Sequence, residues 1–407
     1  MANTGAQKRF RDYTEGPILP QLARFVLPLI ATGVLQLLFN TADIIVVGRW
    51  GGSTPEECET ALAAVGSCGA LITLLINLFI GLSIGAGVTV ANDMGARKYE
   101  DVSRTVHTSV LTALICGVGA TLIGILFAKP LLTLMGTEEV VMAQAVPYMR
   151  AYFCGAIANI LYNYCASMLR STGDTVRPLI FLSAAGVLNV MLNLIMVLVF
   201  HLGAVGVGIA TLIANAVSAG MIFKYLIHEE DMIRLDLRRL RISRQHLSRM
   251  VKIGAPAGLQ GIVFSLSNVF IQAGINGFGS SAVAGSATAL NFEFYSYFLI
   301  AAFGQAAVTF TSQNYGARKF KRIDKSLLCC TITVAVIGAV LGNLAYLFGP
   351  QLLSLYNSDP EVIQYGMNRL QIVSSLYFMC GVMEVISGSM RGLGYAISPM
   401  IVALSGA

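Results

Sequence analysis

Charged side chains are scarce in this chain. Lys, Arg, Asp and Glu make up only 12% of its 407 residues, whereas hydrophobic residues make up 56%. A soluble domain carries about twice that share of charge, so a soluble globular protein of this length is excluded. The apolar residues form long runs separated by short polar breaks, which is typical of membrane-spanning helices. The short segments of alternating polarity that a transmembrane β-barrel requires are not evident.

The motifs of several enzyme classes are also missing. There is no GxxxxGK[ST] loop, which argues against an ATP-driven pump contained in this chain. The eight cysteines include no CxxC pair and the four histidines no HExxH motif, so the cysteines are interpreted as small buried hydrophobic residues. No acids are paired at matching depth in the apolar runs. We therefore expect no enzyme and no cofactor, and energy has to come from an ion gradient or from the gradient of the substrate itself.

What the chain does contain is an internal repeat. Gly-Ala-Arg-Lys begins at Gly95 and again at Gly316, 221 residues later. Upstream, Pro28 matches Pro256 at an offset of 228. A duplicated membrane half is the usual build of a secondary transporter. Further matches at the offset of 221 are Arg170 with Arg391, Gly173 with Gly394, and Pro178 with Pro399.

The apolar runs predict an all-α polytopic membrane protein. Its fold class is two six-helix bundles related by a pseudo-two-fold axis along the membrane normal. Partners of residues 187–227 would occupy positions 408–448, so we expect the second bundle to be truncated after about ten transmembrane helices. The predicted spans are 20–48, 61–92, 104–128, 141–170, 178–200, 204–227, 248–276, 282–313, 323–348 and 361–390, with an eleventh beginning near Pro399.

Basic residues orient these spans. With the N-terminus in the cytoplasm, only Arg49, Lys129, Arg150 and Arg369 among the Lys and Arg residues fall on or near the other side, as the positive-inside rule requires. We therefore expect a multi-pass protein of the cell (inner) membrane. Its parts are an N-terminal lobe (1–227), a basic cytoplasmic linker (228–247) and an incomplete C-terminal lobe (248–407).

The basic linker is predicted to lie on anionic lipid headgroups, the alternative being a nucleic-acid or regulatory role. The partners that we expect are the lipid bilayer and small drug-like molecules, with no nucleic acid, and the protein is expected to be a monomer.

Charged and polar side chains within the spans are candidates for function, because burying them in a bilayer is costly. Asp43 shares one helix face with Gln36 and Asn40. The alternative for Asp43 is a carboxylate near the outer helix end that reaches water. Asn189 and Asn193, four residues apart, can offer oxygen ligands to a cation or can hydrogen-bond between helices.

Two further carboxylates lie in the second copy of the repeat. Glu293 is followed by aromatic residues that include Tyr297, and Glu384 lies nearer the cytoplasmic end, where snorkelling or pairing with Arg391 is the alternative. Neither Asp43, Glu293 nor Glu384 has an acidic counterpart at the repeat offset. We therefore expect the two halves to differ in their ionisable chemistry. A substrate or second proton site is predicted from Gln36, Asn40, Glu293, Tyr297 and Glu384.

In combination, several motifs resemble the multidrug and toxic compound extrusion (MATE) family, in its bacterial drug-exporter branch, over essentially the whole chain. They are Gly-Ala-Arg-Lys after spans 2 and 8, Arg170-Ser-Thr-Gly173-Asp174, Leu188-Asn189-x-x-x-Asn193 and Gly208-Ile-Ala-Thr211.

The resemblance implies a site for Na⁺ or a proton built from Asp43, Asn189, Asn193 and Thr211. Some family members have Asp where this chain has Asn193, so the choice between Na⁺ and H⁺ stays open. The resemblance also implies a multidrug efflux antiporter that exchanges organic, often cationic, compounds for Na⁺ or H⁺ by alternating access. The alternative is a lipid-linked oligosaccharide flippase of the same superfamily, against which the small number of intramembrane cations argues.

Overall fold

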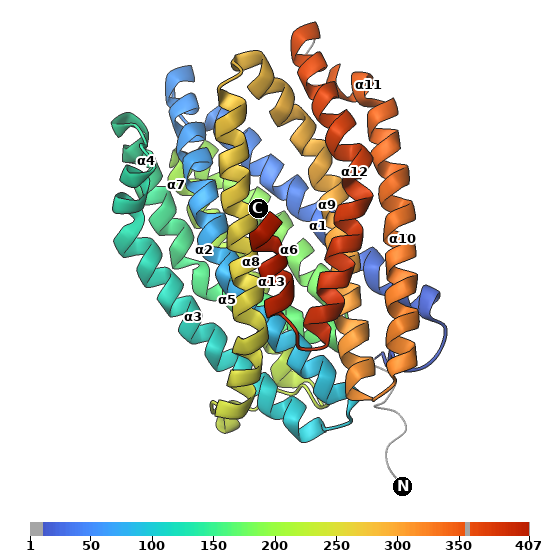
Figure 1. Ribbon diagram of the computed structural model, residues 1–407. Coiled ribbons are helices and arrows are strands. Elements are labelled where there is room, and N and C mark those ends of the chain that lie inside the picture. Colours follow the sequence, from blue (N-terminus) through green and yellow to red (C-terminus); the bar gives the residue numbers. More distant parts are fainter. Residues whose placement is uncertain (1–10, 355–358, 407) are drawn as a thin grey trace. The chain divides into compact units, whose positions relative to one another are not determined.

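The computed structural model describes residues 11–354 and 359–406, and every regular element in them is helical (Figure 1). Nine of these helices are long and apolar enough to cross a membrane. The elements are α1 (Ile18–Trp50), α2 (Pro55–Gly95), α3 (Tyr99–Leu134), α4 (Glu139–Cys154), α5 (Ala156–Ser171), α6 (Val176–Leu194), η2 (Ile195–Val199), α7 (Gly203–His228), η3 (Leu237–Arg239), α8 (Arg244–Asn276), α9 (Ser280–Gly316), α10 (Phe320–Leu347), α11 (Gly349–Ser354), α12 (Pro360–Gly392) and α13 (Ile397–Gly406).

The predicted spans correspond to these helices, with one interruption that the hydropathy pattern does not show. The span at 141–170 is two helices of 16 residues each, α4 and α5, which meet at Gly155. A Cβ atom at Gly155 would lie 3.0 Å from the Cα of Leu212 in α7. Glycine therefore allows α7 to approach the junction closely.

The chain folds as two compact units. Unit 1 comprises residues 1–11, 35–94 and 98–262, and unit 2 comprises 12–34, 95–97 and 263–407. The divisions within α1 and α8 follow Val34 and Ile262, which are 228 residues apart, the same offset that relates Pro28 to Pro256. The lobe boundaries 1–227 and 248–407 remain a prediction, because the two units are defined by packing and not by the repeat.

Matching backbone turns give the repeat a structural counterpart. Arg97 and Arg318, the third residues of the two Gly-Ala-Arg-Lys segments, both adopt the left-handed conformation with φ of 57°. In each copy the backbone N–H of the following lysine donates to a carbonyl oxygen in the last turn of the preceding helix. Lys98 donates to Asp93 and Lys319 to Asn314, both at 2.9 Å. Such bonds close a helix end, so the repeated Gly-Ala-Arg-Lys segment ends a helix in the same way in both copies.

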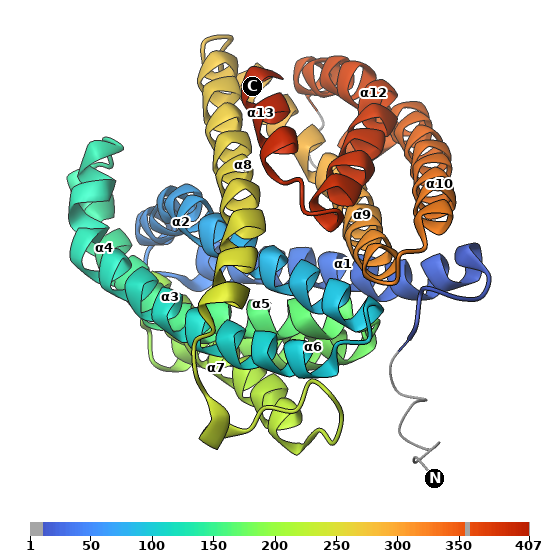
Figure 2. The same ribbon diagram turned by 60° about the horizontal axis from the view of Figure 1, so that its bottom comes forward.

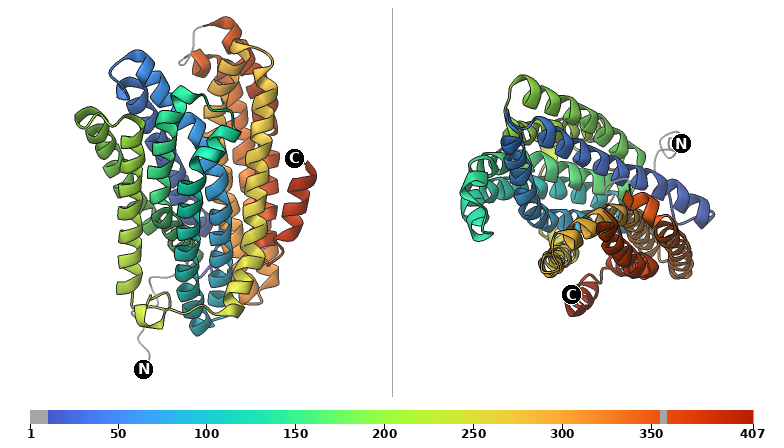
Figure 3. Two further views of the ribbon diagram at one scale, coloured as in Figure 1. Left: turned by 90° about the vertical axis from the view of Figure 1, so that its left-hand side faces the viewer. Right: turned by 90° about the horizontal axis from the view of Figure 1, so that it is seen from above.

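Unit 2 contains a packed set formed by α9, α10 and α12 (Figure 2). The segment before α1 is tied to it, because the Tyr13 ring stacks on Phe310 with centroids 4.2 Å apart and the Tyr13 N–H donates to Oε1 of Gln313 at 3.0 Å. The short helix α13 follows α12 and is the red segment at the C-terminus in Figure 3.

In unit 1, α3, α5 and α7 pack together, while α2 and the first part of α8 approach backbone to backbone. A Cβ at Gly254 would lie 2.6 Å from the Cα of Leu82, and one at Gly258 would lie 2.7 Å from the carbonyl oxygen of Leu78. Clashes with backbone atoms cannot be relieved by a side-chain rotation. The two helices therefore pack as small-residue surfaces do in membranes.

This packing predicts the effect of one added methyl group. Gly254→Ala is expected to lower the free energy of unfolding by about 1–3 kcal/mol, the usual cost of overpacking. Gly66→Ala, on α2 at a position with no heavy atom within 4 Å of the new Cβ, is the matched control and is expected to be neutral or slightly stabilising. Thermal unfolding in detergent measures both. Equal melting temperatures for the two variants would contradict the close approach.

Candidate functional site

Four polar residues of unit 1 form a hydrogen-bonded chain. The Nδ2 group of Asn193 donates to Oδ1 of Asp43 and lies 3.3 Å from Oδ1 of Asn189. The Nδ2 group of Asn189 in turn donates to Oγ1 of Thr211 at 3.4 Å. These are the residues predicted for the cation or proton site. The structure therefore brings together side chains from α1, α6 and α7.

Local sequence features position this chain of residues, which we call the Asp43 cluster. Asn189 and Asn193 lie one helical turn apart on α6, and both are buried. A Cβ atom at Gly186, one turn earlier, would collide with the Phe39 ring of α1, so glycine permits the close approach of these two helices. Directly after Leu194, the helix widens into the π-helical turn η2, a feature frequent at functional sites.

The chemistry of the Asp43 cluster suits a small cation. The buried Oδ1 of Asn193 has no hydrogen-bond partner among the described residues, and a buried acceptor in that state is costly unless a ligand satisfies it. Carboxylate, amide and hydroxyl oxygens are ligands for hard ions. The cluster has one carboxylate, so one proton or one monovalent cation neutralises its charge. No group of three or more His, Cys, Asp or Glu that could hold a metal ion occurs in the described part of the chain.

Gln36 and Asn40 do not join the cluster. Both side chains are exposed, although Asp43 on the same helix is half-buried. Neither side chain makes a hydrogen bond within residues 11–354 and 359–406. Their predicted part in substrate binding stays a prediction, and helix periodicity alone grouped them with Asp43.

In unit 2, Glu293 of α9 is held by Arg369 of α12. The Nε and Nη2 atoms of Arg369 donate to the two carboxylate oxygens at 2.7 and 2.9 Å, and its Nη1 donates to Oγ of Ser286 at 2.7 Å. The Tyr377 hydroxyl donates to the backbone carbonyl of Glu293 at 3.2 Å. Sequence reasoning placed Arg369 on or near the outer side and missed this pair. Its position inside an apolar span was the available signal.

Glu384 also has a basic partner. Nη1 of Arg391 lies 3.2 Å from Oε1 of Glu384, so the pairing considered from the sequence occurs. Tyr297 is about half exposed, and no hydrogen bond of its side chain is found among the described residues. The three C-terminal candidates thus do not form one hydrogen-bonded cluster. Whether they bind a substrate or a second proton stays a prediction.

Comparison with known proteins adds to this geometry. The model of the MatE family matches residues 28–195 and 256–407, which leaves out the N-terminal segment and residues 196–255, a stretch that includes α7 with Thr211 as well as the basic linker. The chain belongs to the MatE family. It is therefore a transporter and a multi-pass membrane protein, not an enzyme. The predicted family and the all-α polytopic fold are confirmed.

Curated relatives extend over most of the chain. The Bacillus subtilis protein named Probable multidrug resistance protein YoeA is 28% identical over 94% of this chain and 83% of its own length. The multidrug export protein MepA of Staphylococcus saprophyticus is 22% identical over 96% of this chain and 85% of its own. The FAD transporter of Shewanella oneidensis is 24% identical over 91% of this chain and 82% of its own.

Solved structures show the same fold. An outward-facing multidrug resistance MATE family transporter superposes with a TM-score of 0.89 at 23% sequence identity, covering 99% of this chain and 88% of that one. A MOP superfamily transporter from Pyrococcus furiosus gives the same TM-score at 24% identity. At these identities the likeness establishes the fold of this MatE protein and not its substrate.

Proposed function

We propose that this MatE protein is a secondary active efflux antiporter, which exports organic, often cationic, compounds in exchange for Na⁺ or H⁺. The observation that carries the proposal is the Asp43 cluster, in which the one carboxylate accepts a hydrogen bond from Asn193, whose buried Oδ1 has no hydrogen-bond partner among the described residues. Relatives named for multidrug resistance or multidrug export support the substrate class. Because another relative is named FAD transporter, an anionic compound also belongs among the substrates to be tested.

The proposed coupling follows from charge. A carboxylate within a membrane span is costly when it is neither neutralised nor hydrated. Binding of one proton or one Na⁺ by Asp43 removes that cost and so changes the relative free energies of the transport states. Alternating access, a cytoplasmic N-terminus in the cell membrane and a monomeric state are parts of the same proposal. The flippase alternative gains no support from the relatives above.

Transport in proteoliposomes tests the proposal. Vesicles loaded with the cationic dye ethidium are expected to release it when an opposing Na⁺ gradient is imposed at equal pH, or when an opposing pH gradient is imposed without Na⁺. The gradient that drives release identifies the coupling ion. FAD in the same assay probes an anionic substrate. Release that follows neither gradient, and equals that from protein-free vesicles, would contradict ion-coupled export.

A further inference from the structure

The basic linker between the two halves is hydrogen-bonded to two consecutive residues of α3. The Asp236 N–H donates to Nε2 of His107 at 3.1 Å, and the Ser243 N–H donates to Oγ1 of Thr108 at 3.1 Å. Both α3 side chains are buried. Residues 237–242, which we call the basic arch, are therefore held at both ends against the N-terminal part of α3. The arch lies entirely within unit 1.

The side chain of His107 is held in place beneath the basic arch. Its Nδ1 lies 2.7 Å from the Ser103 carbonyl oxygen, so this nitrogen carries the proton and donates. Nε2 lies 3.1 Å from both the backbone nitrogen and the carbonyl oxygen of Asp236, so both ring nitrogens have backbone partners. A side chain with both ring nitrogens bonded has little freedom to reorient. The ring is thus expected to hold its place whether a ligand is bound under the arch or not.

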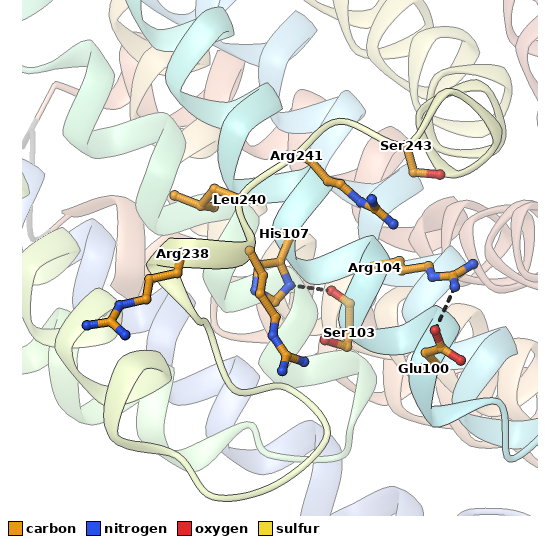
Figure 4. Close-up of a pocket in the computed structure, with 9 residues that line it drawn as sticks. Glu100, Ser103, Arg104, His107, Arg238, Leu240, Arg241 and Ser243 are labelled. Atoms are coloured by element: carbon orange, nitrogen blue, oxygen red, sulfur yellow. Dashed lines mark hydrogen bonds and ion pairs between the residues drawn. The ribbon is translucent and has the colours of Figure 1, made fainter.

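Between the basic arch and α3 lies a cavity of about 420 Å³ (Figure 4). Four arginines line it against a single glutamate. Its volume lies in the range of small-ligand pockets. The arginines are Arg104, Arg238, Arg239 and Arg241, and the glutamate is Glu100.

Two of the four guanidinium groups already have acidic neighbours. Nη2 of Arg104 donates to Glu100 at 2.6 Å, and Nε of Arg239 lies 3.4 Å from Asp236. The side chains of Arg238 and Arg241 have no carboxylate within ion-pair distance among the described residues. The cavity therefore carries positive charge for which the described residues supply no carboxylate counter-charge.

We propose that the cavity under the basic arch binds a phosphate-bearing anion. Guanidinium groups match phosphate oxygens in geometry and stay charged at every physiological pH. Arg238 and Arg241 would supply the uncompensated charge, while His107 and Thr108 hold the arch in place. The ligand is either the headgroup of an anionic phospholipid or a soluble phosphate compound. The site shares no residue with the Asp43 cluster, so it stands independently of the proposed transport function.

The two sources are separated by two arms of one experiment on the full chain in nanodiscs. In the lipid arm, native mass spectrometry counts phosphatidylglycerol retained from a phosphatidylcholine mixture. In the soluble arm, calorimetry follows pyrophosphate added to nanodiscs of phosphatidylcholine alone. The variant is Arg238→Gln with Arg241→Gln. Its matched control is Lys321→Gln with Lys325→Gln, which removes two positive charges at the start of α10 that do not line the cavity.

Removing two arginines is expected to weaken binding about 30-fold, at about 1 kcal/mol for each basic residue near an anionic surface. The control is expected to bind as the wild type does. A loss confined to the lipid arm identifies a lipid headgroup, and a loss in the soluble arm identifies a soluble phosphate. Equal binding by variant and control in both arms would overturn the proposal. A competition measured on the wild type does not depend on folding of the variant. If excess pyrophosphate does not displace the retained phosphatidylglycerol, a site shared by the two ligands is excluded.

Discussion

Asp43→Asn is expected to reduce ion-coupled dye release to the rate of protein-free vesicles. Its Oδ1 accepts a hydrogen bond from Asn193, and it is the one carboxylate in a cluster otherwise built of amides and a hydroxyl. A unit charge about 4 Å from a monovalent cation contributes about 4 kcal/mol at an effective dielectric constant of about 20. Losing that attraction corresponds to a roughly 1000-fold weaker cation affinity. Proteoliposome efflux and calorimetric titration of Na⁺ measure the two effects.

Controls separate the role of Asp43 from a general loss of charge. Glu59→Gln removes an exposed carboxylate near the start of α2 and is expected to leave coupled release unchanged. Asp43→Glu keeps the charge and is expected to retain part of the coupling. Coupled efflux at the wild-type rate in Asp43→Asn would rule out the cluster as the ion site. The overall proposal of efflux would then need a different carboxylate.

Sequence patterns predicted well what depends on local chemistry. Long apolar runs located the spans, and the doubled Gly-Ala-Arg-Lys corresponds to two helix stops with the same left-handed residue, Arg97 and Arg318. The spacing of Asn189 and Asn193 placed both on one helix face, and the structure joins them to Asp43 through hydrogen bonds. The helix stops and the spacing of Asn189 and Asn193 follow from residues that lie close in sequence. The grouping of these two residues with Asp43 was implied by the family resemblance.

Features set by packing between helices could not be predicted from the sequence. The break at Gly155 lies where Leu212 of α7 approaches closely, a contact that no hydropathy profile contains. Arg369 was assigned to a position on or near the outer side because each span was taken to cross once from a cytoplasmic N-terminus. Its partner Glu293 lies 76 residues earlier on another helix, so the pairing is visible only once α9 and α12 pack together.

The pair of Glu293 and Arg369 is expected to stabilise unit 2 only as a pair. The exposed fraction is 9% for the Glu293 side chain and 21% for that of Arg369, and the guanidinium makes three hydrogen bonds to Glu293 and Ser286. Removing one partner leaves the other charge buried without compensation, at a cost of about 3–5 kcal/mol. Glu293→Leu and Arg369→Met are each expected to lower the melting temperature in detergent by several degrees. Glu361→Gln, an exposed acid at the start of α12, is the control and should change it little.

The double variant separates a structural pair from a transport site. Replacing both partners with apolar side chains of similar size removes the unpaired charge, so Glu293→Leu with Arg369→Met is expected to recover most of the stability lost in either single variant. If efflux recovers together with stability, the pair serves the fold of unit 2. If stability recovers while efflux stays lost, Glu293 takes part in transport, as the sequence predicted. Single variants that melt at the wild-type temperature would contradict the energetic role of the pair, because a buried charge without its partner cannot be neutral to folding.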